Sequence, residues 1–205
     1  MKILISAGPT REKIDPVRYI SNRSSGKMGY AIAEAALKAG HSVTLVSGPV
    51  NLPAPENVRL FNVVTAAEMA DVIHSQSADA DVIIMAAAVA DYRPVNPLNS
   101  KMKKLPGDLY LQLERTEDIL ATLGKNKRPS QLLIGFAAET DDLEENALGK
   151  LQRKNLDWIA ANSVADGFGT DTNSLTLFSR NGDKIKIPAN SKKLVAEMLL
   201  KTVLP

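Results

Sequence analysis

The sequence predicts a single α/β domain, residues 1–205, with a Rossmann-like three-layer fold: a mainly parallel sheet between helices, then a C-terminal β-hairpin plus helix. Short apolar runs typical of buried strands alternate with stretches of helical period along most of the chain. Near the C-terminus two such runs flank Asn181-Gly182, which is a strong hairpin signal. A length of 205 residues without a repeat or linker favours one domain.

The first expected strand and helix are separated by a long gap. Residues 2–7 are apolar, lack a helical period and end at Gly-Pro, as a buried strand does. About twenty residues later, an apolar stripe begins at Gly26 and stops at Gly40, a suitable residue to end a helix. The next expected elements are strands over residues 42–47 and 58–64 and a helix to about residue 75, opened by the capping box of Thr65 and Glu68.

A second gap follows the expected strand at residues 81–87. Both gaps come after the carboxyl ends of strands, where α/β sheets bind ligands, so we expect them to be functional loops. The remaining expected elements are a strand near 109–113, a helix over 118–123, a strand over 132–137, a helix over 143–154, a strand over 157–161, hairpin strands over 175–179 and 184–187, and a helix from about residue 191.

The two gaps also carry the positive charge. Residues 9–29 and 91–105 each have a net charge of +3, whereas the whole chain has +2, so the remainder has −4. Two local basic segments suit a small polyanion such as a triphosphate better than a long phosphate backbone. Solvated loop lysines are the alternative, and charge alone does not decide between them.

The composition excludes several classes of chemistry. The chain has no cysteine and only two histidines, His41 and His74, so a thiolate nucleophile, a cysteine zinc site and a histidine triad are not expected. With 4% aromatic residues and little net charge, nucleic acid is not an expected partner. No apolar run approaches the ~20 residues of a membrane span and no signal-peptide layout opens the sequence, so we expect a cytoplasmic protein without a membrane partner.

Residues 22–29 form a candidate anion site. Ser24, Ser25 and Gly26 offer hydroxyls and backbone amides at the start of a predicted helix, where phosphates bind well. The segment is not a Walker loop, and the Gly-x-Gly-x-x-Gly fingerprint of nicotinamide-binding proteins is absent. Ordinary helix capping by serine is the alternative.

Two expected strands end in small residues, at 84–88 and 134–138. Small side chains there let a base and ribose approach the backbone, although tight helix packing requires them equally. Asp91 follows the first of these strands and suits a metal ion or ribose hydroxyls. Lys150 and Lys154 lie one helical turn apart, so they either face one anion together or face solvent.

Six segments, taken in order, resemble one family. They are Ala-Gly-Pro-Thr-Arg-Glu at 7–12, Asp-Pro-Val-Arg-Tyr-Ile-Ser-Asn at 15–22, Ser-Ser-Gly-Lys-Met-Gly at 24–29, Ala-Ala-Ala-Val-Ala-Asp-Tyr-Arg at 86–93, Lys-Met-Lys-Lys at 101–104 and Gly-Phe-Ala-Ala-Glu-Thr at 135–140. This series resembles phosphopantothenoylcysteine synthetase, the phosphopantothenate–cysteine ligase of coenzyme A biosynthesis. The resemblance extends from the first strand to the last helix.

The resemblance implies a homodimeric enzyme that uses CTP and Mg²⁺ to join 4′-phosphopantothenate to L-cysteine. The carboxylate of phosphopantothenate would attack the α-phosphorus and release pyrophosphate, leaving an acyl-cytidylate. The amine of cysteine would then displace CMP. Bacterial members are often fused behind a flavin-dependent decarboxylase, so we expect either a stand-alone synthetase or an excised half.

The resemblance also implies roles for individual residues. Asn22 would handle the acyl intermediate, Lys101 would act in catalysis and bind the nucleotide, and Asp91 is a candidate metal ligand. Further nucleotide contacts are implied at Met85, Ala86, Ala87, Asp91, Glu114, Arg115, Thr116, Glu117, Phe136, Lys150 and Lys154. Residues 115–119 are Arg-Thr-Glu-Asp-Ile, where many members have Lys-Asn-Pro-Asp-Ile. The resemblance therefore supports nucleotide contacts in this stretch less strongly than elsewhere.

Two structural expectations follow. Lys101 lies among prolines and a glycine without an apolar period, so we expect a strap that closes over the nucleotide. We expect a dimer interface at the hairpin around Asn181-Gly182, because an isolated two-stranded ribbon is only marginally stable.

Other classes stay open at this point. A nicotinamide or flavin oxidoreductase and a non-catalytic nucleotide-binding regulator are the alternatives to a ligase. Apart from the resemblance, CTP and ATP are not distinguished, because base choice depends on backbone contacts.

Overall fold

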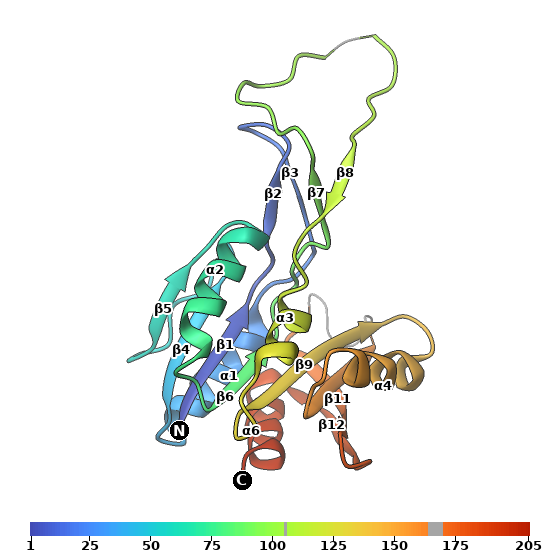
Figure 1. Ribbon diagram of the computed structural model, residues 1–205. Coiled ribbons are helices and arrows are strands. Elements are labelled where there is room, and N and C mark those ends of the chain that lie inside the picture. The colour runs from blue at the N-terminus through green and yellow to red at the C-terminus, as the bar shows by residue number, and fades with distance from the viewer. Residues whose placement is uncertain (105, 164–169) are drawn as a thin grey trace.

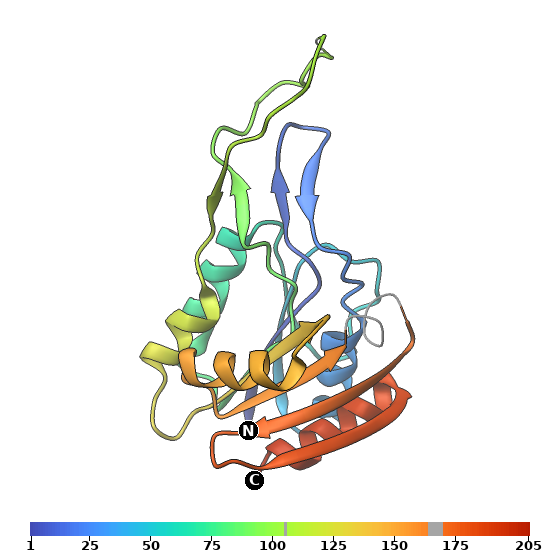
Figure 2. The same cartoon turned by 90° about the vertical axis from the view of Figure 1, so that its right-hand side faces the viewer.

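The computed structural model describes residues 1–104, 106–163 and 170–205, in which helices flank a central sheet and two arms project from it (Figure 1, Figure 2). The strands of the sheet are β1 (Lys2–Ala7), β4 (Ser42–Ser47), β5 (Arg59–Asn62), β6 (Val82–Met85), β9 (Leu132–Glu139), β10 (Trp158–Ser163), β11 (Thr172–Ser179) and β12 (Lys184–Ser191). Their order is β12-β11-β10-β9-β6-β1-β4-β5, with only the β10–β11 and β11–β12 pairs antiparallel. The predicted fold class is therefore confirmed.

Helices cover both faces of the sheet because the inner strands are apolar on both sides. The helices are α1 (Lys27–Lys38), α2 (Ala66–Ser77), α3 (Ile119–Asn126), α4 (Leu143–Arg153) and α6 (Lys192–Val203). Buried side chains of α1 and α6 form one core with β1 and β4, while those of α2, α3 and α4 form a second core on the opposite face. All four residues of β6 are buried, as expected for a strand with a core on each side.

The position of the cavity follows from the strand order. β1 pairs in parallel with β4 on one side and with β6 on the other. The chain continues from β1 outward to β4 and β5, then returns to β6 and proceeds in the opposite direction. Such a reversal opens a crevice at the carboxyl ends of the two central strands, which is where open α/β sheets bind ligands.

Both gaps, which were expected to be loops, contain antiparallel ribbons. The first arm pairs β2 (Arg11–Lys13) with β3 (Tyr19–Ser21), and the second pairs β7 (Tyr92–Pro94) with β8 (Leu113–Arg115). The strand expected near 109–113 is displaced to β8. Each strand has three residues and no apolar alternation, so the local pattern carries little signal. Leu105, the end of the second basic segment, lies outside the described residues.

The C-terminal hairpin is confirmed, but it is longer than predicted and belongs to the main sheet. β11 pairs antiparallel with both β10 and β12, and Gly182 adopts a left-handed φ of 94° at the turn. Leu175 and Leu177 on β11 are buried in the core that includes α6. The hairpin is thus supported within the chain, so the physical reason for expecting a dimer contact at Asn181-Gly182 does not hold.

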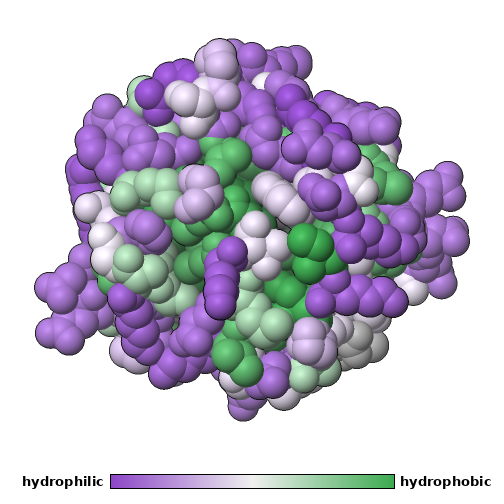
Figure 3. All heavy atoms as spheres, turned by 90° about the horizontal axis from the view of Figure 1, so that it is seen from below, coloured by the Kyte–Doolittle hydropathy of each residue, from purple (hydrophilic) through white to green (hydrophobic). Residues whose placement is uncertain are grey.

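Figure 3 shows the end of the molecule opposite the arms. Apolar side chains gather near the centre of this view, surrounded by hydrophilic ones. Among the helices that the structure describes, none is long and apolar enough to cross a membrane.

Gly29 in the first turn of α1 tests how closely this helix packs on β1. A Cβ at this position would lie 2.5 Å from the Cβ of Ala7, so either the helix or the strand end must shift. We expect Gly29→Ala to lower the free energy of unfolding by about 1–3 kcal/mol, as overpacking does. Urea denaturation measures this change.

Gly149 on α4 provides the control. The three atoms nearest to a Cβ there belong to the guanidinium end of Arg153, the far end of a flexible side chain. Gly149→Ala should therefore stabilise the chain by up to about 1 kcal/mol, through helix propensity. Equal effects of the two substitutions would contradict the close packing of α1 on β1.

Candidate nucleotide-binding site

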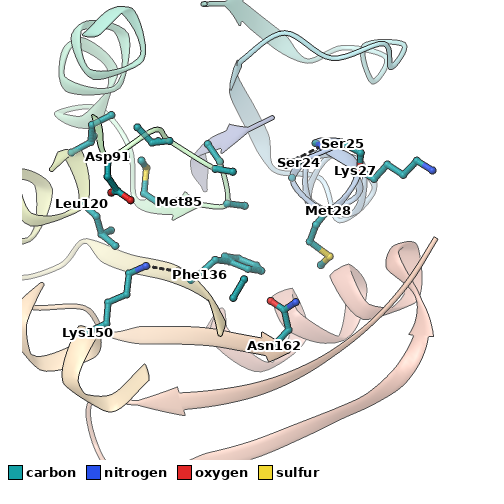
Figure 4. A pocket seen from close by; sticks show the side chains of 18 of the residues that line it. Ser24, Ser25, Lys27, Met28, Met85, Asp91, Leu120, Phe136, Lys150 and Asn162 are labelled. Atoms are coloured by element: carbon teal, nitrogen blue, oxygen red, sulfur yellow. Dashed lines mark hydrogen bonds between the residues drawn. The ribbon is translucent and has the colours of Figure 1, made fainter. Parts of the chain in front are cut away.

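A cavity of about 380 Å³ opens at the carboxyl ends of β6, β9 and β10 (Figure 4). Its size is in the range of small-molecule sites. Residues from four regions line it. Three of these regions are the start of α1, the segment after β6 and the start of α3. The fourth comprises β9, α4 and single positions on β10, β11 and α6. The lining residues are 24–29, 85–89, 91, 116–120, 136, 138, 150, 154, 162, 173 and 192.

The segment after β6 forms one wall and is held by the end of β1. Ser6 and Thr10 are fully buried, and their hydroxyl oxygens accept hydrogen bonds from the backbone N–H groups of Ala87 and Ala90, at 3.1 and 2.9 Å. The N–H of Ala88 donates to the carbonyl of Gly8 at 2.9 Å. These bonds fix a wall of small side chains, which leaves the backbone accessible from the cavity.

Asn22 supports the same wall from outside. Its side-chain amide donates to the carbonyl oxygens of Ala88 and Val89, at 3.1 and 3.2 Å. Asn22 is exposed and is not among the residues that line the cavity. Its contact with an acyl intermediate stays a prediction, and the structure adds that its amide orients the carbonyl groups of the wall.

Thr116 connects this wall to the start of α3. Its hydroxyl donates to the carbonyl of Ala90 at 2.6 Å, and its N–H donates to the carbonyl of Asp91 at 3.0 Å. The carboxylate of Asp91 extends into the cavity (Figure 4). Glu114 and Arg115, by contrast, belong to β8 on the second arm and do not line the cavity.

Glu117 lines the cavity, but its carboxylate is engaged elsewhere. Oε1 accepts hydrogen bonds from the hydroxyl of Thr122 and from Nε2 of His74, each at 2.8 Å. These two contacts lower the pKa of Glu117, with that of Thr122 the stronger. His74, which received no role from the sequence, thus connects α2 to the start of α3.

Two lysines, Lys150 on α4 and Lys154 directly after it, line the cavity. Nζ of Lys150 donates to the carbonyl oxygen of Phe136 at 2.8 Å (Figure 4), and burial lowers the pKa of Lys150. Lys154 forms an ion pair with Asp118, which also caps α3 by accepting from the N–H of Ala121 at 2.9 Å. Burial alone would raise the pKa of Asp118, but the hydrogen bonds from Lys154 and Ala121 lower it.

The start of α1 forms the opposite wall. Gly26 has a left-handed φ of 75°, and its N–H donates to the hydroxyl of Ser24 at 3.3 Å. Lys27 points away from the other labelled side chains (Figure 4) and pairs with Asp171 at 2.5 Å. Lys192 at the start of α6 is buried, donates to the carbonyl of Thr170 at 2.6 Å and has a pKa lowered chiefly by burial.

The structure brings most of the predicted site residues together. Those that line the cavity are Ser24, Ser25, Gly26, Met85, Ala86, Ala87, Asp91, Thr116, Glu117, Phe136, Lys150 and Lys154. Asn22, Lys101, Glu114 and Arg115 do not line it, and Lys101 lies exposed between the strands of the second arm. The cavity is also lined by residues that were not predicted from the sequence: Val89, Asp118, Ile119, Leu120, Asn162, Asn173 and Lys192.

A metal ion would have few protein ligands here. The described residues contain no group of three His, Cys, Asp or Glu side chains placed to hold a metal ion. Mg²⁺ in nucleotide sites is commonly held by one or two carboxylates together with phosphate oxygens and water. Asp91 is a single carboxylate that reaches into the cavity, so it fits an ion that arrives with a nucleotide.

Comparisons with known proteins show which chains this one resembles. The bifunctional coenzyme A biosynthesis protein CoaBC of Vibrio vulnificus is 47% identical over 98% of the chain, and that of Bacillus subtilis is 48% identical over 98%. The chain spans about half the length of these relatives, 51% and 50% respectively. The crystal structure of the C-terminal domain of a CoaBC protein is 46% identical, with a TM-score of 0.85 over 98% of this chain and 93% of that one.

The family model for the C-terminal domain of the DNA/pantothenate metabolism flavoproteins matches residues 1–205. The match includes both walls of the cavity and both arms. The chain therefore belongs to the DNA/pantothenate metabolism flavoprotein C-terminal domain family.

Proposed function

We propose that the chain is a phosphopantothenate–cysteine ligase of coenzyme A biosynthesis, acting through a nucleotide-activated acyl group. One observation carries the proposal: small strand ends and the ring of Phe136 share one cavity with Lys150 and Lys154. Such a cavity offers an apolar, backbone-lined region for a base and cations for phosphates. High identity to CoaBC proteins over nearly the whole chain supports the same function.

In the first half-reaction, a carboxylate oxygen of 4′-phosphopantothenate attacks the α-phosphorus of CTP. The new bond joins that oxygen to phosphorus, and the bond between the α-phosphorus and the bridging oxygen to the β-phosphate breaks, releasing pyrophosphate. Lys150, Lys154 and the amides at the start of α1 neutralise and position the phosphates. Bound Mg²⁺, held by Asp91 and phosphate oxygens, would withdraw charge from the leaving pyrophosphate.

In the second half-reaction, the amine of L-cysteine attacks the acyl carbon. An amide bond forms, the acyl–oxygen bond breaks, and CMP departs with the former carboxylate oxygen while the amine loses a proton. Rigid donors near the carbonyl oxygen favour this step because charge develops on that oxygen. We assign this role to Asn22, whose amide would exchange one of its bonds to the carbonyls of Ala88 and Val89 for a bond to that oxygen.

Substrate dependence tests the function directly. Pyrophosphate release should require both CTP and 4′-phosphopantothenate, and CMP release should also require L-cysteine. Release without the acid substrate, or reduction of a nicotinamide or flavin, would overturn the ligase proposal in favour of another class.

We also propose a homodimer, with the arms as its interface in place of the C-terminal hairpin. Most of the exposed large apolar side chains of the described residues lie on the arms: Val17, Tyr19, Tyr92, Leu98, Leu109, Tyr110, Leu111 and Leu113. Clusters of this kind are characteristic of interaction sites.

Tyr110 is 87% exposed, so Tyr110→Asp should test the interface without loss of folding. Sedimentation at micromolar concentration should give twice the 22.1 kDa chain mass for the unmodified chain and a shift toward the monomer for Tyr110→Asp. Leu194→Asp, on α6 and away from the arms, is the matched control. A monomeric unmodified chain would contradict the dimer.

Asn22→Asp should slow cysteine addition more than acyl-cytidylate formation. The substitution replaces a donor with a carboxylate, and loss of one such donor typically costs about 10² to 10³ in rate. Quenched-flow with labelled phosphopantothenate should show accumulation of the intermediate, with CMP release lagging behind pyrophosphate release. Equal slowing of both half-reactions would mean that Asn22 acts only by orienting the carbonyls of Ala88 and Val89.

The protonation of Lys150 should make kcat/KM for CTP depend on pH. Burial lowers its pKa from the ordinary lysine value, and only the protonated form attracts phosphate. In the free enzyme kcat/KM for CTP should therefore fall as pH rises through this lowered pKa. Lys150→Arg should retain kcat/KM at alkaline pH because guanidinium does not titrate there, whereas Lys125→Arg outside the cavity should leave the alkaline limb in place. An unchanged limb in Lys150→Arg would exclude this role.

A further inference from the structure

The segment that carries Lys101 is attached to the tip of the first arm. The N–H of Met102 donates to Oδ2 of Asp15 at 3.1 Å, and the carbonyl of Met102 accepts from Nη2 of Arg18 at 2.9 Å. The N–H of Leu98 donates to the carbonyl of Ile14 at 2.9 Å. Both polar groups of Met102 are thus bound by one acid–base pair on another ribbon, immediately after Lys101.

Asp15 is an unusual residue to find at the tip of a projecting ribbon. Its side chain is 0% exposed. Oδ1 accepts from the N–H groups of Val17 and Arg18, both at 2.8 Å, and Oδ2 accepts from the guanidinium of Arg18 as well as from Met102. The guanidinium of Arg18 holds the pKa of Asp15 far below its usual range, so the carboxylate is charged at any working pH.

A full carboxylate is needed for this arrangement. One oxygen closes the turn of the ribbon, and the other binds Arg18 and the second arm. An asparagine has a single acceptor oxygen, so it leaves one of these two sets of donors facing an NH₂ group. Asp15 therefore couples the shape of the first arm to the position of the Lys101 segment.

The attachment also determines where Lys101 is presented. Consecutive Cα atoms are ~3.8 Å apart, so binding of Met102 restricts Lys101 strongly. The loop between β7 and β8 lies at the far end of the arms (Figure 1, Figure 2), and none of its described residues, 95–104 and 106–112, lines the cavity. Lys101 is thus held at a defined place on an extended support and not on a freely moving loop.

We propose that Asp15 is a positioning residue for Lys101, which it presents to the nucleotide through the peptide of Met102. This inference rests on the proposed function insofar as Lys101 acts on the triphosphate. If Lys101 acts on the triphosphate, loss of a residue that positions it should slow pyrophosphate release, whereas loss of simple support for the arm need not.

Glu12 provides a matched control on the same ribbon. It is also a buried carboxylate, 3% exposed, but it accepts from the N–H of Ala66 at the start of α2, at 2.8 Å. Glu12→Gln therefore disturbs the attachment of the arm to the domain, whereas Asp15→Asn disturbs the attachment of the Lys101 segment to the arm.

The position of the segment can be measured without reference to activity. The chain has no cysteine, so Lys103→Cys gives a single site for a nitroxide spin label one residue beyond Met102. We expect Asp15→Asn to increase label mobility in the electron paramagnetic resonance spectrum, and Glu12→Gln to leave it unchanged. Arg18→Lys, which keeps the charge but lacks the planar fork, should increase mobility as well.

Single-turnover pyrophosphate release measures the functional coupling in the unlabelled chain. Asp15→Asn should slow this release by up to about 10²-fold, the scale of a misplaced catalytic group. In a Lys101→Gln background, Asp15→Asn should cause no further loss of rate, because both substitutions remove the same contribution, that of Lys101. Thermal unfolding of each variant verifies that the domain remains folded.

Two results would overturn the proposal: label mobility that Asp15→Asn leaves unchanged, or losses from Asp15→Asn and Lys101→Gln that multiply. Equal effects of Asp15→Asn and Glu12→Gln on the label would also reject it in favour of general support of the arm. Absence of pyrophosphate release from the unmodified chain would instead reject the proposed function, and the label spectra would still show whether Asp15 fixes the segment.

Discussion

The attachment of the segment after β6 to the end of β1 is the interaction on which the site depends. Ser6 and Thr10 are polar residues buried at the end of an otherwise apolar strand, and buried polar groups require partners. Their partners are the N–H groups of Ala87 and Ala90. These hydrogen bonds satisfy the buried hydroxyls of Ser6 and Thr10 and shape a wall of small residues. They also fix the points from which both arms project.

The arms change how the charge of the molecule should be interpreted. The two basic segments seen in the sequence lie mostly on the ribbons, whereas Lys150, Lys154 and Lys192 of the cavity come from α4 and α6. Positive charge is therefore present both inside the cavity and on the arms that project from the sheet. Positive charge in both places suits the proposed reaction, in which a nucleoside triphosphate binds and leaves as pyrophosphate and CMP.

Strands and helices that bury a continuous apolar face were predictable from the sequence, as β1, β6 and α1 illustrate. The ribbons were not, because each of their strands has only three residues, and in the second ribbon Tyr92 pairs with Arg115 across a long loop. Within the site, the motifs around Ser24 and Ala86 were found because each is contiguous. Asn162, Asn173 and Lys192 were missed because the fold alone brings them together, although the capping position of Asp118 was a local signal for that residue.

We propose that a carboxylate is activated as an acyl-cytidylate in this cavity, and the fate of the carboxylate oxygen distinguishes this chemistry from the alternatives. Phosphopantothenate labelled with ¹⁸O in its carboxylate should be converted with CTP and cysteine, and the products analysed by mass spectrometry. Attack on the α-phosphorus predicts one ¹⁸O atom in CMP and none in pyrophosphate. Label in inorganic phosphate, with CDP as the other product, would show an acyl phosphate and contradict the account.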